Sequence, residues 1–166
     1  MGKLENLVYA KITALTNMAL KKKIRPDVTL TDVTVINKGI VRALIYNYGI
    51  KGVILDVDDT LRKEFGKIPP CNDRWLEDLR GELKVAILSN GMSKAMQEYF
   101  EAKGITYVPF GGKPLKSNFL RICKSMGLEP EEVMVIGNDL FADIFGGKRS
   151  KMRTGLVTKV RDDKDR

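Results

Sequence analysis

The stretch "ILDVDDTL" at residues 54–61 decides how the rest of the chain is interpreted. Its first part is aliphatic, which is typical of a buried strand. Three carboxylates, those of Asp56, Asp58 and Asp59, follow within four positions. Charged groups beside a buried strand are costly unless they are paired or serve a purpose. We therefore expect this point in the chain to carry chemistry.

The remainder of the chain alternates short apolar strands with amphipathic helices. Asn37 suits the N-cap of a helix that ends near Tyr48. Further strands are predicted over residues 52–57, 84–89, 106–110, 132–137 and 153–160, and helices over residues 72–82, 93–104, 117–127 and 140–147. Nearly continuous apolar strands are typical of parallel sheets buried on both faces. The expected fold class is α/β, with a doubly wound, Rossmann-like parallel sheet flanked by helices.

The composition narrows the possible functions. The 166 residues suffice for one domain with its own core. The absence of histidine excludes a Ser-His-Asp triad, a Cys-His pair and an imidazole metal site. Cys71 and Cys123 form no CxxC pair, so we expect two reduced thiols in a cytoplasmic protein. No apolar run approaches the ~20 residues of a membrane-spanning helix, and no signal peptide is expected.

The formal net charge of +8 is concentrated in two places. Residues 1–25 carry six basic side chains against one acidic side chain. The second basic cluster consists of Lys148, Arg149, Lys151 and Arg153. Such clusters either form a solvated surface or attract a phosphate-bearing partner, which includes nucleic acid, anionic lipid and phosphorylated substrates.

We expect three parts along the chain. Residues 1–36 form a basic, amphipathic N-terminal segment, in which apolar residues at helical spacing predict a helix over residues 4–20. This helix either packs on the domain or extends from it onto an anionic membrane surface, which would place the protein at the inner membrane surface. Residues 37–160 form the α/β domain, and residues 161–166 form a charged tail.

Polar side chains follow four of the predicted strands. In chain order they are Asp56, Asp58 and Thr60; Ser89 and Asn90; Lys113; and Asn138, Asp139 and Asp143. Each has an ordinary structural explanation as a turn residue, a helix cap or an exposed lysine. Because the carboxyl ends of parallel strands meet at one edge of the sheet, the whole set favours a shared site.

These residue types suit the transfer of a phosphoryl group. Mg²⁺ prefers oxygen ligands, and the candidates are Asp56, Asp58, Asp139 and Asp143. The candidate phosphate-binding side chains are Thr60, Ser89, Asn90 and Lys113. Asp56 is positioned to attack phosphorus and form an aspartyl-phosphate. Asp58 is then the general acid for the leaving oxygen and later the general base for water.

The motifs resemble those of the haloacid dehalogenase (HAD) superfamily, and specifically its phosphatases. "DVDDT" is similar to the first motif, DxDx[TV], and Ser89 to the second, a Ser or Thr that ends a strand. Lys113 in "GGKPL" is similar to the third motif, and "GNDLFAD" to the fourth. The resemblance covers residues 51 to about 158 and implies an HAD-like phosphatase domain that depends on Mg²⁺.

The chain most resembles the capless subfamily IIIA and its YqeG-type members, which are similar to phosphatidylglycerophosphate phosphatases. Two positions depart from that pattern. The fourth motif reads Gly137-Asn138-Asp139 where the subfamily usually has GDQ, so either Asn138 or Asp139 contacts the metal. Asp59 replaces the usual Asn, where we expect it to cap a turn and have little effect.

The spacing of the motifs leaves no room for a cap domain, because 30 residues separate Asp58 from Ser89 and 23 separate Ser89 from Lys113. An open site suits a headgroup at a membrane, a macromolecule or a partner's chain better than a small metabolite that needs enclosure. The resemblance implies phosphatidylglycerophosphate as the substrate. One alternative is a soluble phosphatase for a nucleotide, a sugar phosphate or a nucleic-acid end. The other is a module on the same scaffold that binds nucleic acid or ribosomes. The sequence leaves the oligomeric state open.

Overall fold

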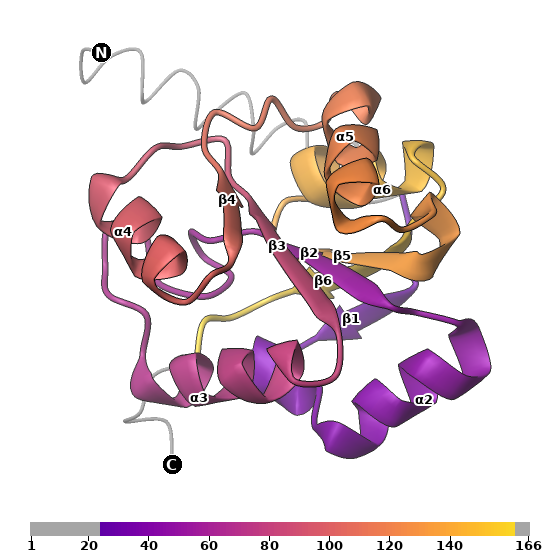
Figure 1. Ribbon diagram of the computed structural model, residues 1–166, viewed down its shortest axis with the longest axis horizontal. Coiled ribbons are helices and arrows are strands. Elements are labelled where there is room, and N and C mark those ends of the chain that lie inside the picture. The colour runs from indigo at the N-terminus through magenta and orange to yellow at the C-terminus, as the bar shows by residue number, and fades with distance from the viewer. Residues whose placement is uncertain (1–23, 162–166) are drawn as a thin grey trace.

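The computed structural model describes residues 24–161, so the helix predicted over residues 4–20 lies outside the described part. Six parallel strands form one sheet in the order β1-β6-β5-β2-β3-β4 (Figure 1). The strands are β1 (Val28–Leu30), β2 (Gly52–Leu55), β3 (Lys84–Leu88), β4 (Thr106–Val108), β5 (Val133–Gly137) and β6 (Arg153–Val157). The predicted doubly wound α/β fold is confirmed. Within residues 24–161, no helix has the length and apolarity needed to cross a bilayer.

Helices cover both faces of this sheet (Figure 1). One layer contains α2 (Lys38–Tyr48), α3 (Pro70–Arg80) and α4 (Lys94–Ala102), and the other contains α5 (Lys116–Met126) and α6 (Gly146–Arg149). Three further turns are η1 (Val33–Val35), η2 (Pro130–Glu132) and η3 (Leu140–Phe145). Successive side chains of β2 point into opposite layers, since Val53 packs in the α3 layer and Ile54 packs with Phe119 of α5.

Local sequence signals explain where the helices begin and end. The Asn37 side chain accepts hydrogen bonds from the first turn of α2, and the Ser93 side chain does the same for α4. α2 ends at Gly49 and α5 at Gly127, both in the left-handed conformation that terminates helices at low cost in glycine. The predicted strands after Asn37, and the predicted helices up to residue 127, are present with ends that differ by a few residues.

Two elements differ from the sequence-based expectation. β1 was not predicted, because its three residues are too few to show a pattern. It pairs in parallel with β6, so the sheet begins before residue 37, where the sequence placed the start of the domain. The short helix predicted over residues 140–147 is instead the π-helical turn η3, which continues into α6.

The order of the strands places a crevice at the centre of the sheet. β2 and β5 are neighbours, but the chain leaves β2 toward β3 and leaves β5 toward β6 on the other side. Connections that diverge in this way leave room beyond the carboxyl ends of the two strands, where α/β proteins bind ligands. Asp56 follows β2 at this point, and Asn138 follows β5.

Asp27 fastens the edge strand β1 to the rest of the sheet. Its carboxylate accepts hydrogen bonds from the backbone N–H of Thr154 (2.7 Å) and the hydroxyl of Thr154 (3.0 Å). The ammonium of Lys148 lies 2.8 Å from the same carboxylate. Burial acts to raise the pKa of Asp27, but the hydrogen bonds from Lys148 and Thr154 outweigh it and lower the pKa below its usual value.

We expect Asp27→Asn to lower the free energy of unfolding by about 1 kcal/mol at neutral pH, because it removes the charge-assisted bonds to β6. The pKa of Asp27 is lower in the folded protein than in the unfolded chain, where it is near 4. The ionised carboxylate therefore stabilises the fold at pH values above about 4, and this stabilisation is lost as the pH falls through the pKa of the folded state. The difference between variant and parent should therefore shrink in acid. Urea unfolding at neutral and acidic pH measures it. Asp78→Asn, which breaks only an exposed pair with Lys38, serves as the control.

Candidate active site

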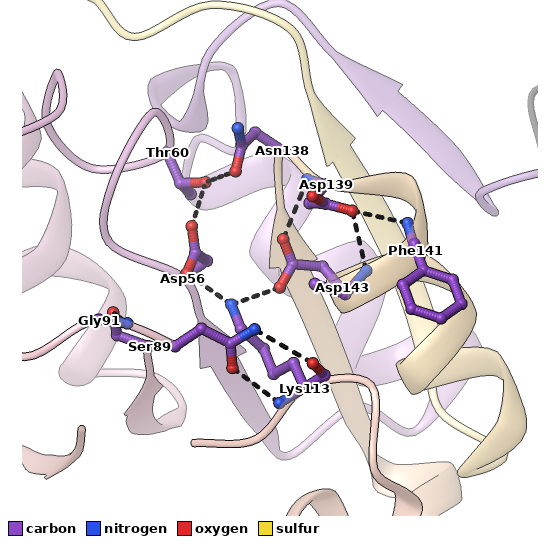
Figure 2. Close-up of polar contacts among 11 residues, drawn as sticks. Asp56, Thr60, Ser89, Gly91, Lys113, Asn138, Asp139, Phe141 and Asp143 are labelled. Carbon is purple, nitrogen blue, oxygen red and sulfur yellow. Dashed lines mark hydrogen bonds and ion pairs between the residues drawn. The ribbon is translucent and has the colours of Figure 1, made fainter. Parts of the chain in front are cut away.

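A buried ammonium group joins two carboxylates at the carboxyl edge of the sheet (Figure 2). Lys113 Nζ lies 2.5 Å from Oδ1 of Asp56 and 2.6 Å from Oδ1 of Asp143. Asp56 comes from the end of β2, Asp143 from η3 after β5, and Lys113 from the loop after β4. The structure thus brings together three of the residues predicted from separate motifs.

Backbone contacts fix the position of Lys113. The Asn90 side chain accepts a hydrogen bond from the N–H of Lys113 (2.7 Å) and donates one to its carbonyl (3.1 Å). Both ends of the Asn90 amide are therefore engaged with the loop that carries the lysine. This arrangement favours a positioning role for Asn90, in place of the phosphate contact expected from the sequence.

A glycine makes room for Asp143. A Cβ atom on Gly137 would lie 2.2 Å from Oδ2 of Asp143, which is far closer than any real contact. The same carboxylate oxygen accepts a hydrogen bond from the N–H of Asp139 (3.0 Å). The fourth motif therefore needs its glycine so that Asp143 can fold back against the end of β5.

Burial governs the ionisation of this cluster. It raises the pKa of Asp143 to about 6, with Lys113 acting against this rise and the charge of Asp56 acting with it. Burial also acts to lower the pKa of Lys113, but the charges of Asp143 and Asp56 outweigh it and raise the pKa above the usual value. Lys113 is therefore a permanent cation at the floor of the site.

Asp58 stands beside the cluster and is held by a residue that the sequence analysis missed. Arg62 Nε donates to Oδ1 of Asp58 at 2.9 Å, and Arg62 Nη1 donates to the carbonyl of Gly66 at 2.8 Å. The guanidinium is buried, which is unusual for an arginine without a structural partner. In the sequence, the sign of this ion pair was that Arg62 follows Asp58 by four residues. Asp59 occupies a left-handed turn (φ 57°), which aspartate tolerates, and its side chain is exposed.

A second group of oxygens meets on the other side of Asp56. The Asn138 side-chain oxygen faces Oδ2 of Asp56 and the backbone carbonyl of Asp58, each 3.3 Å away. Three oxygens converge stably only if a cation lies among them or if the amide rotates so that its nitrogen donates to both. Oxygen ligands of one Mg²⁺ lie about 3 Å apart when each is ~2.1 Å from the ion. The 3.3 Å distances therefore suit a shared Mg²⁺ as well as hydrogen bonds from the rotated Asn138 amide.

The donors that fit a metal ion are mixed in type. Asp56 would contribute its carboxylate, Asn138 its amide oxygen and Asp58 its backbone carbonyl, while the Asp58 side chain remains with Arg62. Within residues 24–161, no three His, Cys, Asp or Glu side chains gather in a metal-binding cluster. A metal here would therefore depend on neutral oxygens and on the substrate for the rest of its ligands.

The structure does not bring the Asp139 side chain, a predicted metal ligand, to these oxygens. Its Oδ1 accepts hydrogen bonds from the N–H groups of Phe141 (2.7 Å) and Ala142 (2.9 Å), which caps the start of η3 (Figure 2). A carboxylate engaged with two backbone donors is drawn away from a neighbouring ion. Asn138 is thus the residue of the fourth motif that faces Asp56.

The remaining predicted residues lie around the same centre. The Thr60 hydroxyl donates to Oδ2 of Asp56 at 3.3 Å, and Ser89 Oγ accepts a hydrogen bond from Gly91 N–H at 3.2 Å, which leaves the serine proton available. A pocket of about 440 Å³ opens above them, and its lining includes Asp58, Arg62 and Ser89. A larger cleft of about 620 Å³ beside Trp75 contains no comparable cluster of buried charges.

We expect Lys113→Met to destabilise the protein by roughly 3 kcal/mol at about pH 8, because two buried carboxylates then face each other without a cation. The native pKa of Asp143 is already raised, so its charge destabilises the fold once the pH rises through that pKa. Protonation at about pH 5 should reduce the loss. Thermal unfolding at both pH values measures this loss of stability. Lys116→Met, at an exposed position of α5, is the control. An equal loss at both pH values would contradict this account of the cluster.

Comparison with known sequences agrees with this site. Residues 68–151 match the family model of haloacid dehalogenase-like hydrolases. Over 113 residues the chain is 33% identical to "Probable phosphatase YqeG" of Bacillus subtilis (strain 168). That alignment covers 67% of this chain and 66% of the relative, so it spans just under two thirds of the relative's length.

Solved structures share the fold at low sequence identity. An HAD-family enzyme of Bacteroides thetaiotaomicron, crystallised with magnesium and inorganic phosphate, superposes with a TM-score of 0.55 at 15% identity, covering 69% of this chain and 98% of that one. An uncharacterized protein from Listeria monocytogenes serotype 4b gives 0.55 at 18% identity, covering 70% and 85%. A 2-haloacid dehalogenase of Pseudomonas syringae gives 0.53 at 14%, covering 63% and 85%. On the strength of the family match and the fold, the chain belongs to the haloacid dehalogenase-like hydrolases.

Proposed function

We propose that this protein is a Mg²⁺-dependent phosphomonoester hydrolase that works through an aspartyl-phosphate. The observation that carries the proposal is the setting of Asp56. One of its oxygens contacts the Lys113 ammonium, and the other faces the Asn138 amide and accepts a hydrogen bond from the Thr60 hydroxyl. A carboxylate held in one orientation beside a fixed cation is prepared to attack a phosphorus atom delivered through the pocket.

Two of the relatives support this proposal. The Bacillus subtilis relative is described as a phosphatase. The Bacteroides thetaiotaomicron enzyme was crystallised with magnesium and inorganic phosphate. Its ligands are those expected for a site that combines bare carboxylates with a phosphate-bearing substrate, and the oxygens around Asn138 are candidates to hold the same cation here.

The proposed reaction has two steps. An oxygen of Asp56 forms a bond to phosphorus as the bond from phosphorus to the leaving oxygen breaks, and a protonated Asp58 donates its proton to that oxygen. Water then attacks the aspartyl-phosphate, Asp58 takes the water's proton, and inorganic phosphate departs. Arg62 keeps the Asp58 side chain at the pocket during both steps. Mg²⁺, when bound, supplies positive charge that offsets the charge of the phosphate.

Lys113 and Ser89 are proposed to bind the phosphoryl oxygens. Both are buried at the floor of the pocket, where a fixed donor is worth more than at an exposed surface. Thr60 is proposed to act through Asp56, because its hydroxyl already donates a hydrogen bond to that carboxylate. These three side chains would stabilise the charge that spreads over the phosphoryl group in the transition state.

The proposed substrate is phosphatidylglycerophosphate. In the described part of the chain, the segments after β2 and β3 each contain one helix of the layer that covers the sheet, α3 and α4, and no additional cap domain. The pocket therefore opens to the surface, which suits a headgroup that remains attached to a membrane. The protein would then work peripherally at the inner membrane surface, and the soluble phosphomonoesters are the alternative that the assay must separate.

The deciding assay is release of phosphate from phosphatidylglycerophosphate in mixed micelles, with soluble phosphomonoesters measured in parallel. We expect turnover of the lipid to require Mg²⁺ and to stop when the ion is chelated. Asp56→Asn should lower turnover by at least about a thousandfold, because an amide of nearly the same shape cannot act as the nucleophile. Turnover of soluble esters alone would refute the lipid assignment, and normal turnover by Asp56→Asn would refute the nucleophile.

A pair of substitutions separates Asn138 from Asp139 as the metal contact. We expect Asn138→Asp to lower the Mg²⁺ concentration for half-maximal turnover by roughly tenfold, since it adds a negative charge among the candidate ligands. Asp139→Asn should leave that concentration unchanged, because asparagine caps a helix as well as aspartate does. If Asp139→Asn raises the Mg²⁺ requirement and Asn138→Asp does not lower it, Asp139 is the ligand.

A further inference from the structure

Exposed apolar side chains stand on the segments that carry the active-site residues. They come from the segments that follow β2, β3, β4 and β5, which meet at one edge of the sheet (Figure 1). We call them the rim: Phe65, Met92, Phe110, Leu115 and Phe141. Phe65 and Met92 also line the pocket itself. Large apolar groups gathered around one opening are typical of a surface that meets another body.

Two rim residues stand where phenylalanine is unfavourable to the fold. Phe65 (φ 59°) and Phe110 (φ 49°) have the left-handed backbone conformation, which glycine and asparagine adopt readily and bulky residues rarely adopt. Their side chains are 87% and 69% exposed, so the core gains little from either ring. An aromatic side chain that strains the backbone and packs on nothing points to a contact outside the protein.

Hydrogen bonds and ring contacts hold parts of the rim in place. The N–H of Phe110 donates to the carbonyl of Gly91 at 3.3 Å, which ties the segment after β4 to the segment that carries Met92. Phe141 stacks on Phe145 with ring centroids 5.5 Å apart. These rim side chains are therefore presented on a fixed scaffold around the pocket.

Exposed lysines alternate with the apolar groups. Lys63 and Lys67 lie two residues to either side of Phe65. Lys94 lies two residues after Met92 and pairs with Glu98, and Lys116 directly follows Leu115. The exposed acidic side chains between β2 and Phe65 are those of Asp59 and Glu64. Four exposed lysines thus stand against three exposed carboxylates on these segments, those of Asp59, Glu64 and Glu98, while Asp58 and Asp139 lie half-buried in the pocket. The ammonium groups beside the apolar side chains can meet an anionic partner.

We propose that the rim is a docking surface for an anionic lipid bilayer, which delivers a phosphorylated headgroup directly to the pocket. The proposal rests on the proposed phosphatase function and names where the substrate resides. Separate apolar side chains flanked by lysines suit an interface in which rings enter the acyl boundary and ammonium groups stay with the headgroups. A protein partner would favour a continuous apolar patch from which lysine is depleted.

The test measures binding of the purified full-length chain to vesicles, without reference to turnover. The probes are vesicles of phosphatidylcholine alone and vesicles in which about half of the lipid is phosphatidylglycerol. We expect binding to the anionic vesicles that weakens with added salt. Phe65→Asn and Phe110→Asn, each suited to the left-handed backbone, should weaken it at least about tenfold when combined. Their thermal unfolding should be at least as resistant as that of the parent.

The matched control is Tyr46→Gln, which removes a ring that is 82% exposed on α2, far from the pocket. We expect this variant to bind vesicles as the parent does. If the rim variants bind as well as the control, binding comes from another surface, including residues 1–25, and the proposal is overturned. If the parent ignores vesicles and self-associates in sedimentation through the same phenylalanines, the rim is an interface between copies.

The design also separates this proposal from the proposed function. A protein that hydrolyses soluble esters but does not bind vesicles retains its phosphatase assignment and loses the docking surface. A protein that binds anionic vesicles through Phe65 and Phe110 but releases no phosphate from any ester retains the docking surface and loses the activity.

Discussion

The buried ammonium of Lys113 is the interaction on which the rest of the site depends. It lies between Asp56 and Asp143, which come from opposite sides of the point where the chain reverses direction across the sheet. Without this cation, two carboxylates could not share a buried space in their charged forms. The lysine thus holds the two halves of the α/β sheet together at their carboxyl edge. It also sets a fixed positive charge 2.5 Å from Asp56, the proposed nucleophile.

Several parts of the structure serve to place that ammonium. Asn90 holds the backbone of Lys113 by a pair of hydrogen bonds, and Gly137 leaves the space that Asp143 occupies. Arg62 likewise holds the Asp58 side chain in place through a hydrogen bond from its Nε. The residues proposed to react are therefore held in place by polar contacts with neighbouring side chains. Such support keeps catalytic side chains within the small tolerances that chemistry demands.

The sequence predicted the sheet because its strands are apolar along their whole length. It predicted a shared site because polar residues follow four of the predicted strands. It missed β1, whose three residues show no period. It also could not distinguish the roles of Asn138 and Asp139, because adjacent side chains after a strand point in different directions. Only the geometry of η3 shows that Asp139 caps its first turn. Arg62 was missed because a buried arginine looks like a surface arginine in sequence.

The amide at position 138 has a consequence for the release of product. Two carboxylates and one ammonium give the Asp56–Lys113–Asp143 cluster one net negative charge. A bound divalent cation would make the total of cluster and ion positive, whereas an aspartate at position 138 would make it neutral. Inorganic phosphate is therefore attracted more strongly to the loaded site than it would be with a third carboxylate. Inorganic phosphate is the product of the proposed reaction, so we expect turnover to slow as phosphate accumulates.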